Sequence, residues 1–233
     1  MKTYDFQQGE VLLFDKELDW TSFDLVQKVR NHLCRALGIK KLKVGHAGTL
    51  DPRATGLMIV CTGKATGRIE SLQAGEKEYI ATLRMGATTP SFDTETPEDK
   101  QYPTDQITKE SILEVLEKFK GDQLQVPPLF SAVKIGGKRA YRHARKGEDV
   151  TLAPRPVHIR ELELLDFNDK LITLRVCCSK GTYIRALARD LGTALDSGAY
   201  LTALRRTRVG DARVEEAMSV QFFLDNLNDF VTK

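Results

Sequence analysis

A twelve-residue run, GHAGTLDPRATG from Gly45 to Gly56, constrains the fold more than any other part of this chain. Its three glycines permit backbone angles and close approaches that other residues resist. The proline that follows Asp51 disfavours helical backbone angles at that aspartate. The apolar run LMIVC comes directly afterwards, at residues 57–61, and is typical of a buried strand. The sequence therefore predicts a loop that carries Asp51 and is supported by a core strand.

Two side chains in this loop, His46 and Asp51, have ready proton or nucleophile chemistry. Reactive groups are often placed on loops that a rigid element supports. An Asp-Pro pair in a glycine-rich loop is more often a simple turn, however. The loop residues by themselves therefore leave both a catalytic and a structural interpretation of Asp51 open.

The composition is that of a soluble globular protein, since 41% of the 233 residues are apolar and 29% are charged. No apolar run approaches the ~20 residues of a membrane-spanning helix, and the N-terminus has no apolar signal core. The four cysteines show no CxxC spacing, and the four histidines lie too far apart in sequence to suggest metal ligands. We therefore expect a cytoplasmic protein without disulfides, metal or cofactor.

Charge is unevenly distributed, although the net charge is only +3. Residues 134–160 hold eight basic and two acidic side chains. Residues 175–213 hold eight basic and three acidic side chains. Residues 93–122 hold nine acidic and four basic side chains. Such segregation is typical of a polyanion-binding face opposite a solvated face, and ordinary surface charge produces it about as often. A shorter basic run, Lys40-Lys41-Leu42-Lys43, leads into the Asp51 loop, where phosphate contact and a solvated loop are equally open.

Hydrophobic periodicity predicts a mixture of strands and helices along the chain. Strands are expected at residues 9–16, 57–61, 76–85, 157–167 and 171–177. Helices are expected from Thr21 or Ser22 to Gly38 and at residues 63–71, 108–120, 181–195 and 219–227. The acidic stretch at 92–102 is expected to be a surface excursion. Prolines and glycines around residues 124–153 predict an insertion that moves as a unit within one domain of mixed α and β structure.

The run GHAGTLDPRATG resembles the signature loop of the TruB-type pseudouridine synthases, which isomerise a uridine in the T-loop of transfer RNA. Three further segments resemble the same family in the expected order: KEY from Lys77, SKGTYIR from Ser179 and LRRTRVG from Leu204. The segments FSAVK from Phe130 and AYRHARKG from Ala140 resemble the thumb-like loop with which the family grips RNA. Together these matches span about residues 10–210.

The resemblance implies an α+β pseudouridine synthase fold, in which helices flank a central, mixed and largely antiparallel sheet. It implies a single catalytic domain over residues 1–233, with the thumb-like RNA-binding insertion at about 124–153. Many members carry a small C-terminal RNA-binding domain, the PUA domain. About twenty residues follow Gly210 here. We therefore expect a short form without that domain, acting as a monomer with no membrane and no obligatory protein partner.

The resemblance implies catalytic roles for Asp51, Tyr79 and Arg185. Asp51 would act as covalent nucleophile or as base, and Arg185 would pair with it through its forked guanidinium. Tyr79 would stack on the extracted base or help to remove the C5 proton. Periodicity alone favours different roles, with Tyr79 as a core aromatic and Arg185 as a surface residue of its helix.

Contacts with the RNA are implied for a further set of basic, aromatic and hydrogen-bonding residues. His46 would insert where the uridine leaves its stack, or would only hydrogen-bond within the loop. The full set is His46, Lys134, Arg142, Arg145, Lys180, Tyr183, Arg205 and Arg206.

The sequence thus predicts an isomerase that flips out the uridine at position 55 in the T-stem-loop of tRNA and converts it to pseudouridine. One alternative within the family is action on a messenger RNA hairpin that mimics the T-loop. Another is an RNA-binding module without activity, which the joint presence of Asp51, Tyr79 and Arg185 disfavours because binding requires none of them. A glycoside hydrolase is disfavoured because the motif loops hold no second carboxylate.

Overall fold

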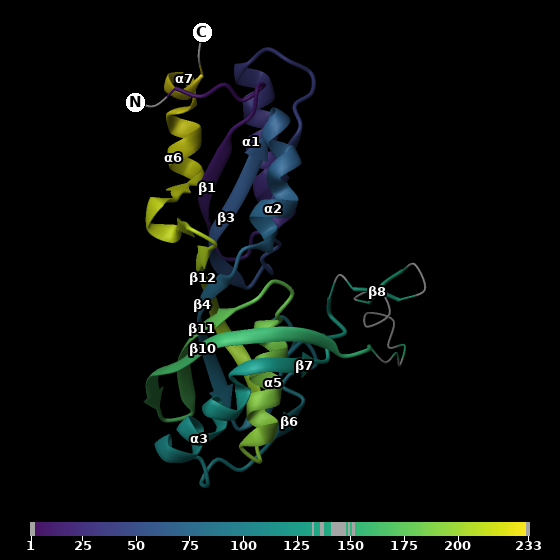
Figure 1. Cartoon of the computed structure of the whole chain (residues 1–233), viewed down its shortest axis with the longest axis vertical. Coiled ribbons are helices and arrows are strands. Elements are labelled where there is room, and N and C mark those ends of the chain that lie inside the picture. Colours follow the sequence, from purple (N-terminus) through teal and green to yellow (C-terminus); the bar gives the residue numbers. More distant parts are fainter. Residues whose placement is uncertain are drawn as a thin grey trace. The chain divides into compact units, whose positions relative to one another are not determined.

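The computed structural model describes residues 3–131, 133–135, 138–140, 148, 150 and 152–231 (Figure 1). The chain divides into two compact units, of which unit 1 comprises residues 1–78 and 205–233 and unit 2 comprises residues 79–204. Strands β4 (Lys77–Met85) and β12 (Ala199–Val209) contain the two boundaries, so each begins in one unit and ends in the other. The single catalytic domain expected over residues 1–233 stays a prediction.

Unit 1 is built on the strand order β14-β1-β3-β12. Strand β3 runs antiparallel to β1 on one side, with Val11 opposite Cys61, and its end also pairs antiparallel with β2. Strand β1 pairs in parallel with β14, so the pairing is mixed. The strands introduced here are β1 (Val11–Lys16), β2 (Val44–His46), β3 (Ala54–Thr62), β13 (Ala212–Arg213) and β14 (Met218–Ser219).

Helix α1 (Ser22–Ala36) forms where the sequence predicts it, because its ends and its apolar face agree. The Thr21 hydroxyl accepts a hydrogen bond from the Asp24 amide, and the Asp24 carboxylate accepts one from the Thr21 amide, which completes a capping box. At the other end Gly38 adopts a φ of +64°, a backbone angle that favours glycine. The buried positions Leu25, Val26, Val29 and Leu33 recur at helical spacing.

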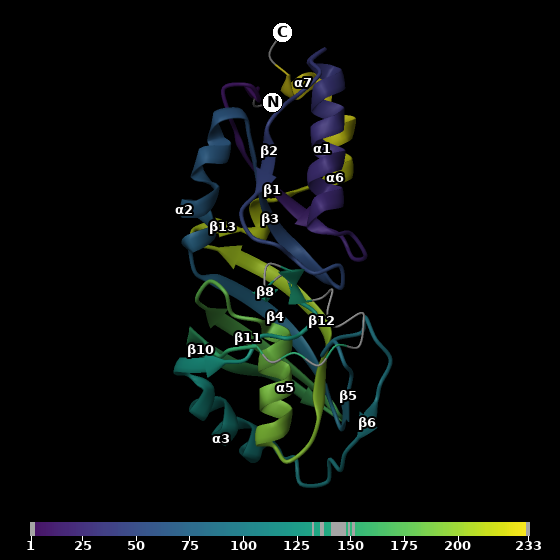
Figure 2. The same ribbon diagram turned by 90° about the vertical axis from the view of Figure 1, so that its right-hand side faces the viewer.

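Shorter helices complete unit 1, and Figures 1 and 2 show α1, α2 and α6 gathered around β1 and β3. Aromatic rings close the core beneath α6, where the ring of Phe223 meets that of Phe14 edge-to-face at 5.3 Å. The helix predicted at 63–71 is a 3₁₀ turn followed by α2, and the one predicted at 219–227 is divided into α6 and α7. Their bounds are η1 (Gly63–Arg68), α2 (Ile69–Ala74), η2 (Val214–Glu216), α6 (Val220–Asp225) and α7 (Leu227–Phe230).

Unit 2 is built on the strand order β12-β4-β11-β10-β7. The predicted hairpin between β10 and β11 is confirmed, and Asp169 in its turn has a φ of +54°. Strand β10 also pairs antiparallel with β7. The bounds are β7 (Gly121–Gln125), β10 (Arg155–Asn168) and β11 (Leu171–Cys178), with short pairs β5 (Ala87–Thr88) to β6 (Lys100–Gln101) and β8 (Lys134–Ile135) to β9 (Lys138–Arg139).

Helices α3 (Lys109–Phe119) and α5 (Ile184–Ala194) contact each other, and α3 also contacts β10 (Figure 1). Helix α5 begins three residues later than predicted, because Gly181 has a φ of +86° and Tyr183 is extended. The α+β class predicted from the sequence is confirmed. Among the described residues, no helix combines the length and the apolar character needed to cross a membrane.

The prediction that residues 92–102 form a surface excursion is wrong at its start. Phe92 is half-buried and Asp93 is only 3% exposed. An acidic side chain is buried there because a basic partner from α5 accompanies it, and a count of charges along the sequence does not detect such a partner.

Candidate active site

The predicted Asp51 loop links β2 to β3, and β3 is buried along most of its length, as the sequence indicates. Asp51 is half-buried, and its carbonyl accepts a hydrogen bond from the Ala54 amide at 3.0 Å, which closes the turn. Gly56 ends the loop with a φ of +103°. A Cβ atom at that position would lie 2.3 Å from the backbone oxygen of Arg206, so only glycine fits against β12.

Arg206 holds the loop from beneath. Its side chain is among the largest that are fully buried, with 1% of the residue exposed. The guanidinium donates to three backbone oxygens, those of Leu57 at 2.8 Å, Gly48 at 3.1 Å and Thr49 at 3.4 Å. A planar fork of donors can satisfy several carbonyls at once, which an ammonium cannot. Arg206 therefore fixes the path of the loop on both sides of Asp51.

The loop is also held on the side of α1. The Ser22 hydroxyl donates to the Leu50 carbonyl at 3.0 Å and accepts from the Leu50 amide at 2.9 Å. The Asp19 amide donates to the Pro52 carbonyl at 2.9 Å, and the Arg53 guanidinium pairs with the Asp19 carboxylate at 2.8 Å. The residues adjoining Asp51 are thus fixed by backbone contacts, and such preorganisation suits a reactive side chain.

Lys16 places a buried positive charge near Asp51. Its Nζ donates to the carbonyls of Trp20 at 2.7 Å and Glu17 at 2.8 Å. Burial lowers the pKa of Lys16 to about 8, and the negative charges of Asp51 and Asp19 partly oppose that shift. At neutral pH the ammonium is charged, so it attracts the carboxylate of Asp51.

The sequence reasoning did not single out Lys16, although a signal for it was present. Burial alternates along β1, so that Leu12, Phe14 and Lys16 lie on the same face. A lysine on the buried face of a predicted strand needs hydrogen-bond partners or a nearby carboxylate. This alternation would have identified it.

His46 ends β2 opposite Val60 and is half-buried. Burial lowers the pKa of His46, the charge of Arg206 lowers it further, and the backbone of Gly48 acts in the opposite direction. Its ring is therefore neutral at neutral pH. Its Nδ1 atom is buried and makes no hydrogen bond within the described part of the chain. The hydrogen bond to the loop that the sequence left open is thus not made by this nitrogen.

In unit 2, Arg185 lies in the first turn of α5 with 4% of the residue exposed. Its Nη1 donates to the Ser91 carbonyl at 3.1 Å, and its Nη2 donates to the Phe130 carbonyl at 2.9 Å. Its Nε lies 3.5 Å from the carboxylate of Asp93, which is equally buried. The surface position that periodicity favoured for Arg185 is wrong. Asp93 was missed because it lies ninety-two residues earlier in the chain.

The other predicted residues of unit 2 differ in exposure. Tyr79 is 8% exposed and shares the buried face of β4 with Ala81 and Leu83. Tyr183 stands at the start of α5, where its amide donates to the side chain of Gln125 at 2.8 Å. Lys180 is exposed.

Two family descriptions match this chain. "TruB family pseudouridylate synthase (N terminal domain)" matches residues 35–184, and "tRNA pseudouridylate synthase B C-terminal domain" matches residues 185–231. The chain belongs to the TruB family of pseudouridylate synthases. It is accordingly an enzyme of the isomerase class, as the sequence predicts.

Relatives in this family cover nearly the whole chain. The tRNA pseudouridine synthase B of Phocaeicola vulgatus is 63% identical over 94% of this chain and 93% of its own length. The enzyme of the same name from Bacteroides thetaiotaomicron is 59% identical over 94% of this chain and 93% of its own length. A chain in the solved structure of a Cbf5-Nop10-Gar1 complex superposes with a TM-score of 0.72 at 28% identity. That match covers 95% of this chain and 55% of the other, and it supports the predicted pseudouridine synthase fold.

The predicted TruB site residues fall into separate groups. Unit 1 holds His46, Asp51 and Arg206 around one loop, together with Arg205, whose guanidinium binds the Asp15 carboxylate through two hydrogen bonds of 3.0 and 2.6 Å. Unit 2 holds Tyr79, Lys180, Tyr183 and Arg185. The pairing of Asp51 with Arg185 stays a prediction, as do the RNA contacts. Arg142 and Arg145 lie outside the described residues, and for Lys134 only the backbone is described.

One RNA contact needs revision on physical grounds. The sequence placed Arg206 among the residues that touch RNA, whereas its guanidinium lies buried beneath the loop with its donors bound to carbonyls. A phosphate would reach it only if the loop opened. Arg205, next to it, is partly exposed and better placed for such a contact.

Proposed function

We propose that this chain converts the uridine at position 55 in the T-loop of tRNA to pseudouridine, with Asp51 as the catalytic residue. Membership of the TruB family and the two relatives named tRNA pseudouridine synthase B support this substrate. The observation that carries the proposal is the Asp51 loop itself. Its backbone is fixed by the buried Arg206 and by Ser22, which leaves the aspartate on a rigid support.

The reaction is an isomerisation and needs no co-reactant. The N1–C1′ bond breaks, the uracil ring turns, and a C5–C1′ bond forms, after which C5 loses its proton and N1 carries one. A carboxylate suits either route, as a nucleophile that forms a temporary covalent bond or as a base that removes a proton from the sugar. The positive charge of Lys16 lies near Asp51, where it attracts negative charge.

The remaining roles follow the family resemblance and the local geometry. In our proposal Arg185 supplies a fixed positive charge, because Asp93 and two carbonyls hold its guanidinium in one orientation. Tyr79 would stack on the flipped base or assist in removal of the C5 proton. His46, neutral and half-buried, would take the place of the extruded uridine, since extrusion costs a few kcal/mol that the protein must offset.

The test is the release of tritium from C5-labelled uridine in an unmodified tRNA transcript. We expect release by the wild-type protein and none by Asp51→Asn, with tRNA binding retained because the change is nearly isosteric. Asp211→Asn, in an exposed turn of the same unit, is the matched control and should retain activity. A transcript with cytidine at position 55 should release no label from the T-loop.

Two outcomes would overturn the proposal. Turnover by Asp51→Asn at the wild-type rate would remove the aspartate from the mechanism. Tight binding of tRNA by the wild-type protein with no release from any transcript would favour an RNA-binding module instead, and Asp51 would then be a turn residue.

A further inference from the structure

A basic segment connects α1 to β2 and separates two clefts on the surface of unit 1. One cleft lies against the last turns of α1, and the other lies against η1. Both are lined by Lys41, Leu42 and Lys43. We call the cations that line these two clefts the basic ridge, which consists of Arg30, Arg35, Lys40, Lys41, Lys43 and Lys64.

The basic ridge carries charge of a single sign. Residues 25–69 include nine lysines and arginines, and their one acidic residue is Asp51. Among the described residues, no carboxylate lines either cleft and none forms an ion pair with a ridge cation. The Nζ of Lys64 donates to an uncharged group, the side-chain amide of Gln8, at 2.8 Å.

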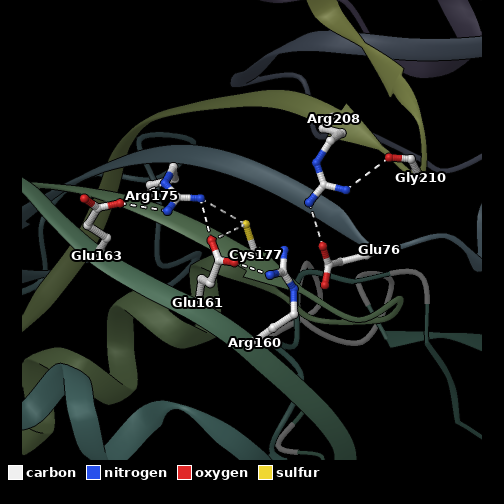
Figure 3. A network of polar contacts seen from close by, with 8 residues as sticks. All are labelled: Glu76, Arg160, Glu161, Glu163, Arg175, Cys177, Arg208 and Gly210. Atoms are coloured by element: carbon white, nitrogen blue, oxygen red, sulfur yellow. Dashed lines mark hydrogen bonds and ion pairs between the residues drawn. The ribbon is translucent and has the colours of Figure 1, made fainter.

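Two partly exposed arginines elsewhere in the protein are paired with carboxylates. On β10 and β11, Arg175 binds Glu161 at 2.6 Å and Glu163 at 2.8 Å, as Figure 3 shows. In unit 1, Arg208 binds Glu76 at 2.6 Å (Figure 3). The ridge cations differ from these two arginines, because among the described residues no carboxylate pairs with them. Uncompensated like charges repel one another, and a polyanion that binds there removes that repulsion.

The backbone of the ridge is fixed at both ends. The end of α1 forms a Schellman motif, in which the Ile39 amide donates to the Cys34 carbonyl at 3.0 Å and the Gly38 amide donates to the Arg35 carbonyl at 3.2 Å. At the other end the Gly63 amide donates to the Lys43 carbonyl at 2.9 Å. A fixed backbone reduces the entropy lost when the side chains bind a ligand.

We propose that the basic ridge binds phosphates of the RNA backbone away from the uridine that is modified. This inference rests on the proposed function, which supplies a polyanionic substrate. Exposed lysines act as point charges for phosphate and give affinity and position without reading the sequence. Lys43 adjoins β2, the strand that ends at His46, so a backbone held at the ridge is held by the same compact unit as the Asp51 loop.

The first test neutralises the centre of the ridge with the triple change Lys40→Gln, Lys41→Gln and Lys43→Gln. These lysines lie outside the Asp51 loop, and our proposal gives them phosphate contacts only, so KM for tRNA should rise by about tenfold while kcat changes little. The slope of log affinity against log salt concentration should become shallower by about two, since each lost phosphate contact removes ~0.7–0.9. The single change Lys41→Glu should act in the same direction, because Lys41 lines both clefts.

The matched control makes the same change in net charge elsewhere. Lys109, Lys118 and Lys120 are exposed on or next to α3, within the acidic segment at 93–122. Their triple change to Gln should leave KM and the salt slope at wild-type values. Equal effects of the two triple variants would overturn the inference, because net charge and not the ridge would then govern binding.

The second test measures tRNA binding at the ridge independently of catalysis. Cys34 lines the cleft beside α1 and is partly exposed, whereas Cys61, Cys177 and Cys178 are buried. Under native conditions a maleimide should therefore modify Cys34 first. We expect an unmodified tRNA transcript to slow this reaction in the wild-type protein and to slow it much less in the ridge variant.

The two proposals fail in distinguishable ways. Normal pseudouridine formation without protection of Cys34, and with an unchanged salt slope in the ridge variant, would overturn the ridge and leave the synthase proposal intact. Protection of Cys34 without turnover on any tRNA would overturn the synthase proposal and retain RNA at the ridge. Protection by vesicles that contain phosphatidylserine, with none by tRNA, would overturn RNA as the occupant in favour of a membrane surface.

Discussion

Unit 1 contains two groups of cations with different environments, one at the Asp51 loop and one on the basic ridge. Beneath the Asp51 loop, Arg206 and Lys16 are buried and donate to backbone carbonyls. On the basic ridge, Lys40, Lys41 and Lys43 are exposed and no described carboxylate pairs with them. A buried cation is tolerated only when its hydrogen bonds are made, so the first group supports the chain. The second group remains available to a ligand.

The largest expected effect comes from Arg206→Met. The change removes the donors of three carbonyls around the loop, two of them in buried hydrogen bonds, and each unsatisfied buried acceptor costs about 1–3 kcal/mol. We expect the free energy of unfolding, measured in urea, to fall by about 3 kcal/mol or more. Arg205→Met is the adjacent control, and it should cost less than about 1 kcal/mol because its pair with Asp15 is partly exposed. Equal losses of unfolding free energy in the two variants would show that the buried arginine stabilises the fold no more than the partly exposed one.

The next effect concerns pH and Lys16. Burial lowers the pKa of Lys16 from 10.5 to about 8, so between these values the unfolded chain binds a proton that the folded chain does not. The free energy of unfolding of the wild type, minus that of Lys16→Met, should be constant below about pH 8. It should rise by at most about 3 kcal/mol up to pH ~10.5 and then level off. A difference that is flat across this range would show that the ammonium is not desolvated.

A smaller effect is expected from Arg185→Lys, the counterpart of Arg206 in unit 2. A lysine cannot bind the Ser91 and Phe130 carbonyls and Asp93 together, so the positive charge would shift. Tritium release should slow by about 10- to 100-fold. Arg189→Lys, one turn later on α5, is the control and should be close to wild type. A normal rate for Arg185→Lys would mean that the forked geometry is not needed.

The smallest effect is expected from Glu163→Gln, at the exposed network of Figure 3. Arg175 would keep its charged partner Glu161 and lose the charge of Glu163, while the glutamine oxygen could still accept its hydrogen bond. Exposed ion pairs contribute little and are screened by salt. Thermal unfolding at low and high salt should show a slight loss that disappears at high salt. A loss that persists would mean that this network behaves like the buried cations.

Much of the fold could be predicted because its signals are local. Helix α1 has its cap, its apolar spacing and its terminal glycine within eighteen residues, and the β10–β11 hairpin has alternation and a turn residue. The predictions were wrong where helices begin or are interrupted. Helix α5 starts late because Gly181 adopts a positive φ. The last predicted helix is interrupted at Asn226, whose backbone angles (φ −104°, ψ 11°) end α6 before α7 begins at Leu227.

The candidate site was predicted unevenly for the same reason. The Asp51 loop is contiguous, so a resemblance over twelve residues found it. Asp93 was read as a surface residue because its partner, Arg185, is distant in sequence. Lys16 was overlooked because a lysine at the end of a strand is usually exposed, and only the alternation of burial along β1 marks it as buried.

The sequence by itself determined the family, the loop that presents Asp51, and most of the helices and strands. Those features depend on the backbone preferences and the spacing of residues that are close together in the sequence. Only the tertiary structure decided which cations are buried and which are exposed. That outcome depends on carbonyls and carboxylates brought together from distant segments, as when Arg206 meets Gly48 and Leu57. The free energy of placing a charge depends on those partners and on access to water, and neither is visible along the chain.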